Sequence, residues 1–159
     1  MNTSQKIFTK ETIMPQLEQW QCEGEVVFTN GCFDIVHLGH VDYLEKARNL
    51  GVRMIVGLNT DASVSRLKGP ERPLVNEYAR ARVMAAFEFV DAVILFDEPT
   101  PLELITFLKP DILVKGDDYT VDNIVGADVV IAHGGAVKTI ALVQGYSTTS
   151  MVNKIKQLL

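Results

Sequence analysis

The sequence predicts a single α/β domain, residues 1–159, built on a Rossmann-like, doubly wound parallel sheet of five strands with helices on both faces. Short apolar runs alternate with amphipathic segments along the chain, a pattern typical of βαβ units. The runs are apolar almost throughout, as in strands that are buried on both faces. The chain has 159 residues and no internal repeat or linker, so one domain is expected.

The expected elements follow in chain order. An N-terminal helix at about residues 10–22, centred on Ile13 to Trp20, precedes the α/β core. The apolar runs place the strands at Val26–Asn30, Arg53–Leu58, Ala92–Phe96, Ile112–Lys115 and Val137–Val143. Further helices are expected over residues 37–50 and 76–88, from Thr100 and from Ser147. At Thr100, Pro101 and Glu103 are interpreted as completing a capping box.

Composition and charge narrow the classes of function. The chain is 47% hydrophobic and 22% charged, as is usual for a soluble globular protein. Its apolar runs are too short to span a bilayer, so no membrane association is expected. The first six residues lead into no signal-peptide region, and two cysteines form no disulfide framework, so a reduced, cytoplasmic protein is expected. A net charge of −5 without a basic run argues against nucleic acid as a partner.

Polar motifs follow four of the predicted strands. In doubly wound sheets ligands bind at the carboxyl ends of the strands, where the strand order reverses. The motifs at these ends are Thr29-Asn30-Gly31, Asn59-Thr60-Asp61, Lys115-Gly116-Asp117-Asp118-Tyr119 and Gly145-Tyr146-Ser147-Thr148-Thr149. We therefore expect one site that these four loops share.

The most informative motif runs from Thr29 to His40, where the first strand passes through a glycine turn into a helix. Such a junction offers free backbone N–H groups and the positive end of a helix dipole, which suit phosphate. His37 and His40 lie at i and i+3 and are expected on one face of the first turn. Gly39 between them lets a ligand approach the backbone. Cys32 is interpreted mainly as a small residue packed in the turn, and a zinc site would need further ligands from Cys22, Cys32 and His133.

Ser147-Thr148-Thr149 opens the last helix. Ser147 is a good N-cap, and capping alone explains one hydroxyl. Three consecutive hydroxyls after Gly145 exceed what a cap requires, so with the N–H groups of the helix start they predict a second phosphate cradle.

Residues 63–73 carry three cations, one glycine and two prolines, and are expected to form a loop. A solvated surface loop would explain this composition. The position after the second strand favours phosphate contact instead. Arg66 and Arg72 are then expected to grip a sugar phosphate with forked donors, and Lys68 to act as a point charge on a triphosphate.

The segment from Lys115 to Tyr119 closes the fourth strand. Gly116 would allow a base or a ribose to lie against the backbone, and Asp118 would accept from it. Asp117 is interpreted equally as a ligand or as part of a Gly-Asp turn. Asp34 is expected to accept sugar hydroxyls or to cap the following helix. Asn76 and Arg80 are expected to start and decorate a helix, and His133 to end one.

Together these segments resemble the nucleotidyltransferase superfamily, and most closely the adenylyltransferase domains that make nucleotide-activated heptose. The resemblance rests on the histidine motif, the Leu67-Lys68-Gly69-Pro70-Glu71-Arg72-Pro73 loop, residues 111–119 and Ser147-Thr148-Thr149. Neither G-x-G-x-x-G after a strand nor G-x-x-x-x-G-K-[ST] is present.

The resemblance implies transfer of the adenylyl group of ATP to D-glycero-β-D-manno-heptose 1-phosphate, with release of pyrophosphate. It implies His37, His40 and Lys68 as catalytic residues, and Asp34, Arg66 and Arg72 as contacts of the sugar phosphate. The implied nucleotide contacts are Thr29, Asn30, Gly31, Cys32, Phe33, Gly39, Lys115, Gly116, Asp118, Ser147, Thr148 and Thr149. Mg²⁺ is expected to arrive on the triphosphate, because the motifs contain no dedicated carboxylate cage. A homo-oligomer is also expected, with a dimer favoured.

Two alternatives stay open at this point. The first is a CTP-dependent cytidylyltransferase for a polyol phosphate such as glycerol 3-phosphate; relatives of that kind carry an arginine where this chain has Leu142. The second is a nucleotide-binding sensor without turnover, which would not need both histidines.

Overall fold

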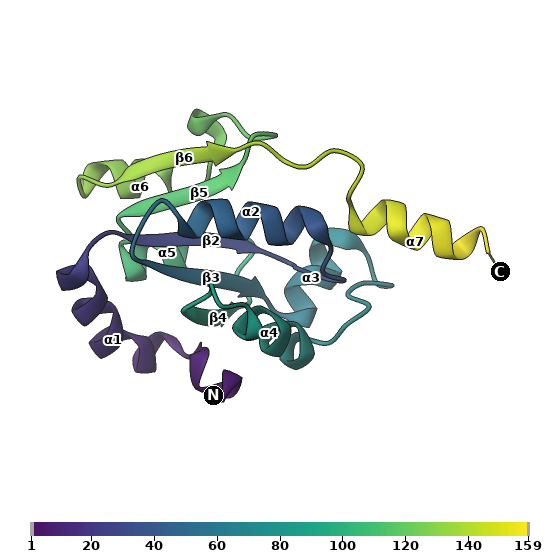
Figure 1. Cartoon of the computed structure of the whole chain (residues 1–159), viewed down its shortest axis with the longest axis horizontal. Coiled ribbons are helices and arrows are strands. Elements are labelled where there is room, and N and C mark those ends of the chain that lie inside the picture. Colours follow the sequence, from purple (N-terminus) through teal and green to yellow (C-terminus); the bar gives the residue numbers. More distant parts are fainter. Residues whose placement is uncertain (1, 159) are drawn as a thin grey trace.

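The computed structural model describes residues 2–158, which fold around one six-stranded parallel sheet (Figure 1). The strands lie in the order β1-β4-β3-β2-β5-β6. Their bounds are β1 Ile7–Phe8, β2 Val26–Gly31, β3 Arg53–Asn59, β4 Ala92–Phe96, β5 Ile112–Gly116 and β6 Ala136–Ile140. The doubly wound parallel sheet and its five predicted strands are thereby confirmed. The sixth strand, β1, pairs with β4 through only two residues, which is too short to produce a periodic signal in the sequence.

The strand order reverses beside β2. The chain passes from β2 to β3 and β4 on one side, then returns across the sheet to β5 and β6 on the other. The neighbouring ends of β2 and β5 therefore form the switch point at which ligands bind in such sheets. The histidine motif leaves β2 at this point, and Lys115 lies near the end of β5.

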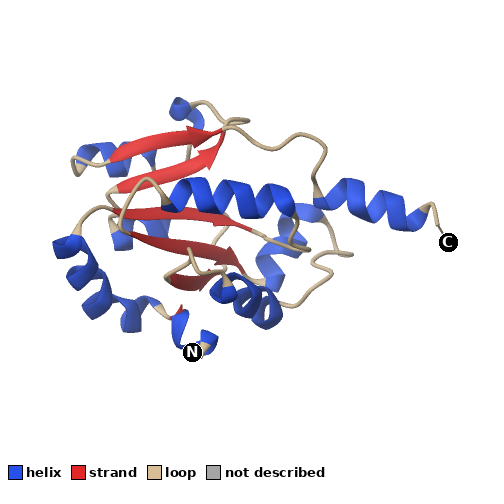
Figure 2. Cartoon of the chain, viewed as in Figure 1, coloured by secondary structure: helices blue, strands red, loops and turns tan. Residues whose placement is uncertain are grey.

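Helices cover both faces of the sheet (Figure 2). One face packs against α1 Lys10–Glu23, α5 Leu102–Leu108 and α6 Ala127–Ala132, in a core that includes Trp20, Phe28 and Ile105. The other face packs against α2 Leu38–Arg48 and α4 Glu77–Ala86, around Leu44, Met54 and Met84. Because both faces are buried, the strands need the continuous apolar runs seen in the sequence.

Most expected helices are present, with ends that agree within a few residues. Thr9 caps α1 through a capping box with Thr12, and Asn76 caps α4. Ser147 caps the last helix, α7 Thr148–Lys156, by accepting from the Ser150 N–H, as predicted. His133 is the C-cap of α6, also as predicted.

Three expectations about local structure were wrong. The helix expected at Thr100 begins at Leu102 with Pro101 as its N-cap, and proline has no side-chain acceptor to form a capping box. The segment expected as a loop is largely a helix, α3 Asp61–Lys68, because the Thr60 side chain caps it by accepting from Ser63 N–H. The last strand ends at Ile140, so residues 141–143 lie outside the sheet.

Two short 3-10 helices complete the chain, η1 Thr3–Lys6 and η2 Val121–Asn123. Within residues 2–158, none of the helices has the length and apolar character needed to cross a membrane.

Candidate nucleotide-binding site

The loop between β2 and α2 has an unusual backbone. Phe33 and Ile35 adopt positive φ angles of 45° and 58°. Such angles are costly for a residue with a Cβ, and most of all for β-branched isoleucine. Asp34 lies between them and is 2% exposed. The surrounding contacts therefore hold this loop in a strained shape, directly before the histidine pair.

His37 and His40 form a stacked pair at the start of α2. His37 is the N-cap residue, and the His40 N–H donates to the His37 carbonyl oxygen at 2.9 Å. The two imidazole rings lie 3.9 Å apart at 21°, and Phe33 approaches His40 edge-on at 5.3 Å. A Cβ added at Gly39 would lie 3.1 Å from the His37 ring, so a larger residue there would crowd the pair. The predicted placement of both histidines on one face is confirmed.

Both imidazoles are neutral at neutral pH. Burial lowers the pKa of His40 to about 4, with a further contribution from His37, and burial also lowers the pKa of His37. The Nδ1 atoms of both rings are buried without a hydrogen-bond partner among residues 2–158. A buried polar atom without a partner is costly, so a ligand that accepts from these rings would relieve the cost.

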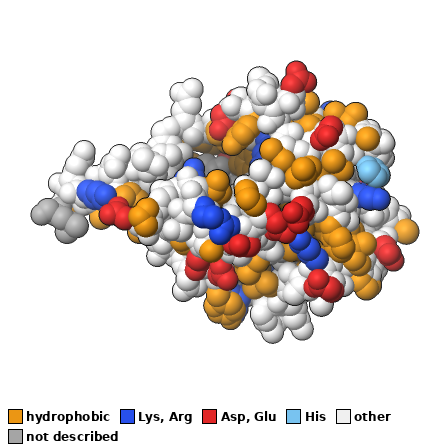
Figure 3. Space-filling view, turned by 180° about the vertical axis from the view of Figure 1, so that it is seen from behind, with side chains coloured by type: hydrophobic (Ala, Val, Ile, Leu, Met, Phe, Trp, Pro, Cys, Tyr) orange, Lys and Arg blue, Asp and Glu red, His pale blue; other side chains and the backbone are white. Residues whose placement is uncertain are grey.

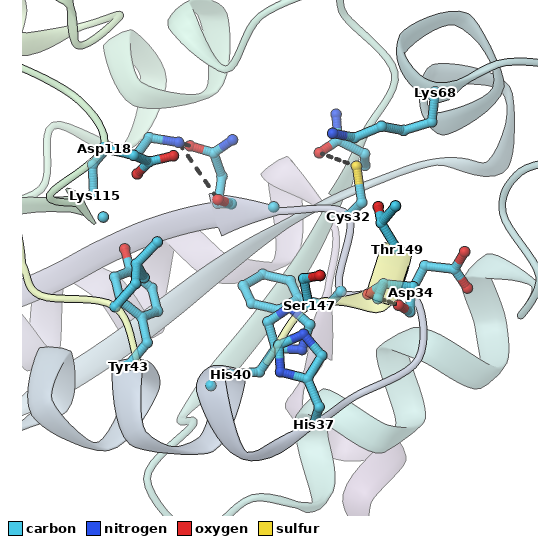
Figure 4. Close-up of a pocket in the computed structure, with 18 of the residues that line it drawn as sticks. Cys32, Asp34, His37, His40, Tyr43, Lys68, Lys115, Asp118, Ser147 and Thr149 are labelled. Atoms are coloured by element: carbon cyan, nitrogen blue, oxygen red, sulfur yellow. Dashed lines mark hydrogen bonds between the residues drawn. The ribbon is translucent and has the colours of Figure 1, made fainter. Parts of the chain in front are cut away.

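The loops at this sheet edge enclose a cavity of about 620 Å³ (Figure 4). Its size is within the range of small-molecule sites. Its polar and glycine lining is contributed by Asn30, Gly31, Cys32, Asp34, His37, Gly39, His40, Asn59, Lys68, Arg72, Lys115, Gly116, Asp118, Ser147, Thr148 and Thr149. Nearly all the residues that the sequence nominated are thus brought to one place from segments far apart in the chain.

One end of the cavity holds Lys115 and Asp118 (Figure 4). The Lys115 ammonium donates to the Asn30 side-chain oxygen at 2.5 Å. Burial lowers the pKa of Lys115 to about 8, although the charge of Asp118 works in the opposite direction. A Cβ at Gly116 would lie 2.5 Å from the Asp118 carboxylate, so this glycine allows the carboxylate to fold back against the strand end.

The other end holds the histidines, Ser147 and Thr149, with Lys68 across the cavity (Figure 4). Thr148 Oγ1 donates to the Asp34 main-chain oxygen at 2.7 Å, which attaches the start of α7 to the strained loop. Hydroxyls, two neutral imidazoles, a lysine and a helix N-terminus together form a surface suited to phosphate.

The Asp34 carboxylate accepts hydrogen bonds from other residues of the chain. Its carboxylate accepts from Arg72 and from the main-chain N–H groups of Leu74 and Val75, at 2.7 to 3.0 Å. Burial by itself would raise the pKa of this carboxyl, but these donors hold it below its usual value. Asp34 therefore anchors the Arg72 loop to the histidine loop, a role that the sequence did not indicate.

Three residues that the sequence suggested as contacts do not line the cavity. Thr29 is fully buried, and its hydroxyl pairs with the Tyr43 hydroxyl at 2.7 Å. Arg66 lies in the last turn of α3 and forms an exposed ion pair with Asp97 at 3.1 Å. Asp117 belongs to the turn, where its carboxylate accepts from the Leu142 N–H at 3.2 Å.

The structure adds residues that the sequence analysis passed over. Tyr43, Leu67, Tyr119, Leu142 and Tyr146 also line the cavity. Tyr119 and Tyr146 lie inside motifs already noted, whereas Tyr43 follows the histidine motif at helical spacing and could have been found from that spacing.

Arg80 was expected to decorate a helix surface and is instead 1% exposed. Its guanidinium donates to the carbonyl oxygens of Cys32 and Val75 at 2.7 and 2.9 Å and to the Asp61 carboxylate at 2.7 Å. Arg80 therefore connects the glycine turn of the site, through Cys32, to the start of α3 and to residue 75. The sequence placed Arg80 on the surface of a helix and therefore gave no indication that its side chain is buried.

Cys32 is half-buried and lines the cavity. Its Sγ lies 3.9 Å from the Asn59 side-chain oxygen, and burial raises its pKa. Within residues 2–158, no three His, Cys, Asp or Glu side chains are grouped closely enough to hold a metal ion. The zinc alternative therefore has no ligand set in this part of the chain.

The doubly wound sheet, with the histidine pair at the start of α2 and the hydroxyls at the start of α7 at its switch point, is suited to binding the phosphates of a nucleotide. A model of the cytidylyltransferase-like family matches residues 28–152. The chain belongs to this family.

Comparison with individual proteins identifies more specific relatives of the chain. The chain is 59% identical over 153 residues to the bifunctional protein HldE of Magnetococcus marinus, which covers 96% of this chain and 31% of that protein. It is 61% identical over 137 residues to the HldE protein of Gluconobacter oxydans, covering 86% and 29%. The chain thus spans about a third of the length of these relatives.

Two solved structures share the fold. A lipopolysaccharide core biosynthesis protein from Thermoplasma volcanium superimposes with a TM-score of 0.61 at 29% identity, over 78% of this chain and 99% of that one. A pantoate-beta-alanine ligase from Francisella tularensis superimposes with a TM-score of 0.60 at 13% identity, over 95% and 77% of the two chains. At 13% identity the second likeness concerns the fold alone.

Proposed function

We propose that this chain transfers the adenylyl group of ATP to D-glycero-β-D-manno-heptose 1-phosphate, producing ADP-heptose and pyrophosphate for lipopolysaccharide or surface polysaccharide synthesis. The observation that carries the proposal is the stacked His37–His40 pair, whose partner-free Nδ1 atoms share one cavity with Lys68 and the hydroxyls of α7. The identity to HldE proteins and the likeness to a lipopolysaccharide core biosynthesis protein support the choice of sugar and of pathway.

The reaction requires no protein nucleophile. An oxygen of the sugar phosphate is already ionised and attacks the α-phosphorus of ATP in line; the new P–O bond forms as the bond to pyrophosphate breaks. Negative charge grows on the α-phosphate oxygens and on the leaving oxygen. His40 donates to an α-phosphate oxygen, while His37, Lys68 and the start of α7 hold the leaving phosphates. Catalysis is then positioning and electrostatic stabilisation by preorganised donors.

The donor set fits Mg²⁺ that is carried by the substrate. Among the described residues that line the cavity, the carboxylates are Asp34 and Asp118, and Asp118 lies at the nucleoside end. Arg72 and two backbone N–H groups already donate to the Asp34 carboxylate. Mg²⁺ bound to the triphosphate would neutralise part of its charge, and Lys68 and the hydroxyls of α7 would hold the phosphate oxygens that remain free.

At the other end, Lys115, Gly116 and Asp118 hold the nucleoside, and Arg72 contacts the sugar phosphate beside Asp34. Arg66 is left out of this assignment because its ion pair with Asp97 places it outside the cavity. We place the reaction in the cytoplasm, where ATP is available and where Cys22 and Cys32 stay free thiols. The enzyme acts as a homo-oligomer, with a dimer favoured.

The test is a pyrophosphate-release assay with Mg²⁺, in which ATP and CTP are each paired with β-heptose 1-phosphate and with glycerol 3-phosphate. We expect turnover with ATP and the heptose 1-phosphate, and a mock purification from cells without the expression plasmid measures any contaminating activity. Turnover with CTP and glycerol 3-phosphate alone would replace the proposal with the cytidylyltransferase alternative. ATP binding without turnover on any phosphate ester would leave a nucleotide sensor.

A further inference from the structure

The two strands at the switch point separate before they end. β2 pairs with β5 through two residue pairs, the second of which joins Phe28 to Leu113. By contrast, β2 stays paired with β3 as far as Gly31, and β5 stays paired with β6 as far as Gly116. We call the gap between the ends of β2 and β5 the strand split. Gly31 and Gly116 on its two sides line the cavity, which is seen as a hollow beside the projecting helix α7 in Figure 3.

A tyrosine hydroxyl bridges the strand split. Continuing the β2–β5 register by one step would place Thr29 opposite Val114. The Tyr43 hydroxyl lies 2.7 Å from the Thr29 hydroxyl and donates to the Val114 main-chain oxygen at 3.0 Å. Burial raises the pKa of Tyr43, so the hydroxyl keeps its proton at neutral pH. Because that one proton goes to Val114, the Tyr43 oxygen accepts from Thr29. All three residues are buried, so water does not compete for these bonds.

Tyr43 also belongs to the helix that carries the histidine pair. It follows His40 by three residues on α2, so the two side chains share one face of the helix. Figure 4 shows Tyr43 pointing from α2 toward the strand ends, on the side where Lys115 lies. Lys115 directly follows Val114 and donates across the same split to the Asn30 side-chain oxygen at 2.5 Å. One hydroxyl therefore connects the helix at the phosphate end to the strand at the nucleoside end.

We propose that Tyr43 is a positioning residue for the transfer reaction. Its hydroxyl fixes the width of the strand split and, through α2, the placement of His40 relative to Lys115. In-line transfer requires the α-phosphate to be aligned with its donor while the nucleoside is held, and a misplacement of about 1 Å can cost about 10²-fold in rate. The reaction that Tyr43 serves is the one proposed above, so this role rests on the proposed function, whereas the bridge itself does not.

The first test is Tyr43→Phe, which removes the hydroxyl and keeps the ring. We expect kcat per folded enzyme to fall by about 10- to 100-fold with ATP and the heptose 1-phosphate, while the calorimetric Kd for ATP rises less than about threefold. The contacts at each end are retained, so the loss falls on their alignment. A bridge that only stabilised the fold would lower the midpoint of unfolding and leave kcat unchanged. The control is Tyr78→Phe on α4, where the side chain is exposed and kcat should not change.

Variants of Thr29 separate alignment from stability. Thr29→Val should lower kcat to a similar extent, and Thr29→Ser, which restores a hydroxyl, should recover most of it. Combining Tyr43→Phe with Thr29→Val removes both hydroxyls, so the free energy of unfolding should recover relative to Tyr43→Phe alone while kcat stays low. A kcat that recovers together with stability would overturn the proposal, and so would an unaltered kcat in Tyr43→Phe.

Crystal structures of the unaltered chain and of Tyr43→Phe, both without substrate, test the bridge apart from the reaction. We expect a changed strand split in the variant, in which Lys115 no longer reaches the Asn30 side chain. A variant that keeps the same split and the same Lys115 contact would overturn the proposal. An unaltered chain that releases no pyrophosphate with any phosphate ester would refute the proposed function, and the two structures would then decide by themselves whether Tyr43 sets the strand split.

Discussion

Replacing His40 with alanine separates a catalytic histidine pair from a structural one. The His40 ring stacks on His37 at 3.9 Å, and its Nδ1 atom is buried without a partner among the described residues. Because burial lowers its pKa to about 4, the His40 ring is neutral at pH 7. In the proposed mechanism, the group that donates to the α-phosphate is therefore an N–H of neutral imidazole. Its contribution should grow as charge develops on that oxygen.

Loss of one preorganised donor of this kind costs roughly 10²–10³ in rate. We expect His40→Ala to lower kcat by about that factor while the ATP affinity falls much less, which is the signature of an interaction made mainly in the transition state. His40→Asn keeps a donor and should recover part of the loss. The measurements are steady-state kinetics and calorimetric ATP titration.

The control is His133→Ala, which removes an exposed histidine at the end of α6 and should leave both quantities unchanged. Unfolding curves are measured for each variant to check that it remains folded, because His40→Ala also removes the contact between Phe33 and the His40 ring. A His40→Ala enzyme with nearly unaltered kcat would show that the pair is structural and that the mechanism proposed above is wrong.

Three further predictions concern other parts of the site. Thr149→Val leaves the Ser147 cap in place and should weaken ATP binding about tenfold, the effect of one lost hydrogen bond to a charged group; unchanged affinity in calorimetry would return the hydroxyl to a local role. The kcat/KM for ATP should fall above pH 8 as Lys115 loses its proton, since its pKa is about 8, and Lys115→Arg should extend the plateau by at least about one pH unit; identical pH profiles would contradict this. Arg80→Ala should lower the free energy of unfolding in urea by about 2–3 kcal/mol, because the carbonyl oxygens of Cys32 and Val75 lose their donor and the partly exposed Asp61 carboxylate loses its ion pair. Arg82→Ala on the same helix should change it by less than about 1 kcal/mol, and equal losses would refute the special role of Arg80.

The sheet could be predicted from the sequence because its strands are buried on both faces. Burial on two sides requires continuous apolar runs, and these runs located β2 to β5 to within a residue of their observed ends. Ligand sites in such sheets lie at the carboxyl ends of strands, so the polar motifs there pointed to one cavity. By contrast, β1 gave no signal because two residues cannot show a period, and α3 was missed because its cations resembled a surface loop.

The sequence by itself determined the class of fold, the edge of the sheet that holds the site and most of the residues that meet there. Those features depend on local chemistry and spacing, which a chain carries in its own order. Only the tertiary structure decided what each side chain faces. The Arg80 side chain is buried and donates to the Cys32 carbonyl oxygen. The Asp34 carboxylate accepts from Arg72, and Arg66 forms an ion pair with Asp97. A charged side chain on a helix or loop takes the partner that folding brings within about 3 Å, and that partner lies tens of residues away along the chain.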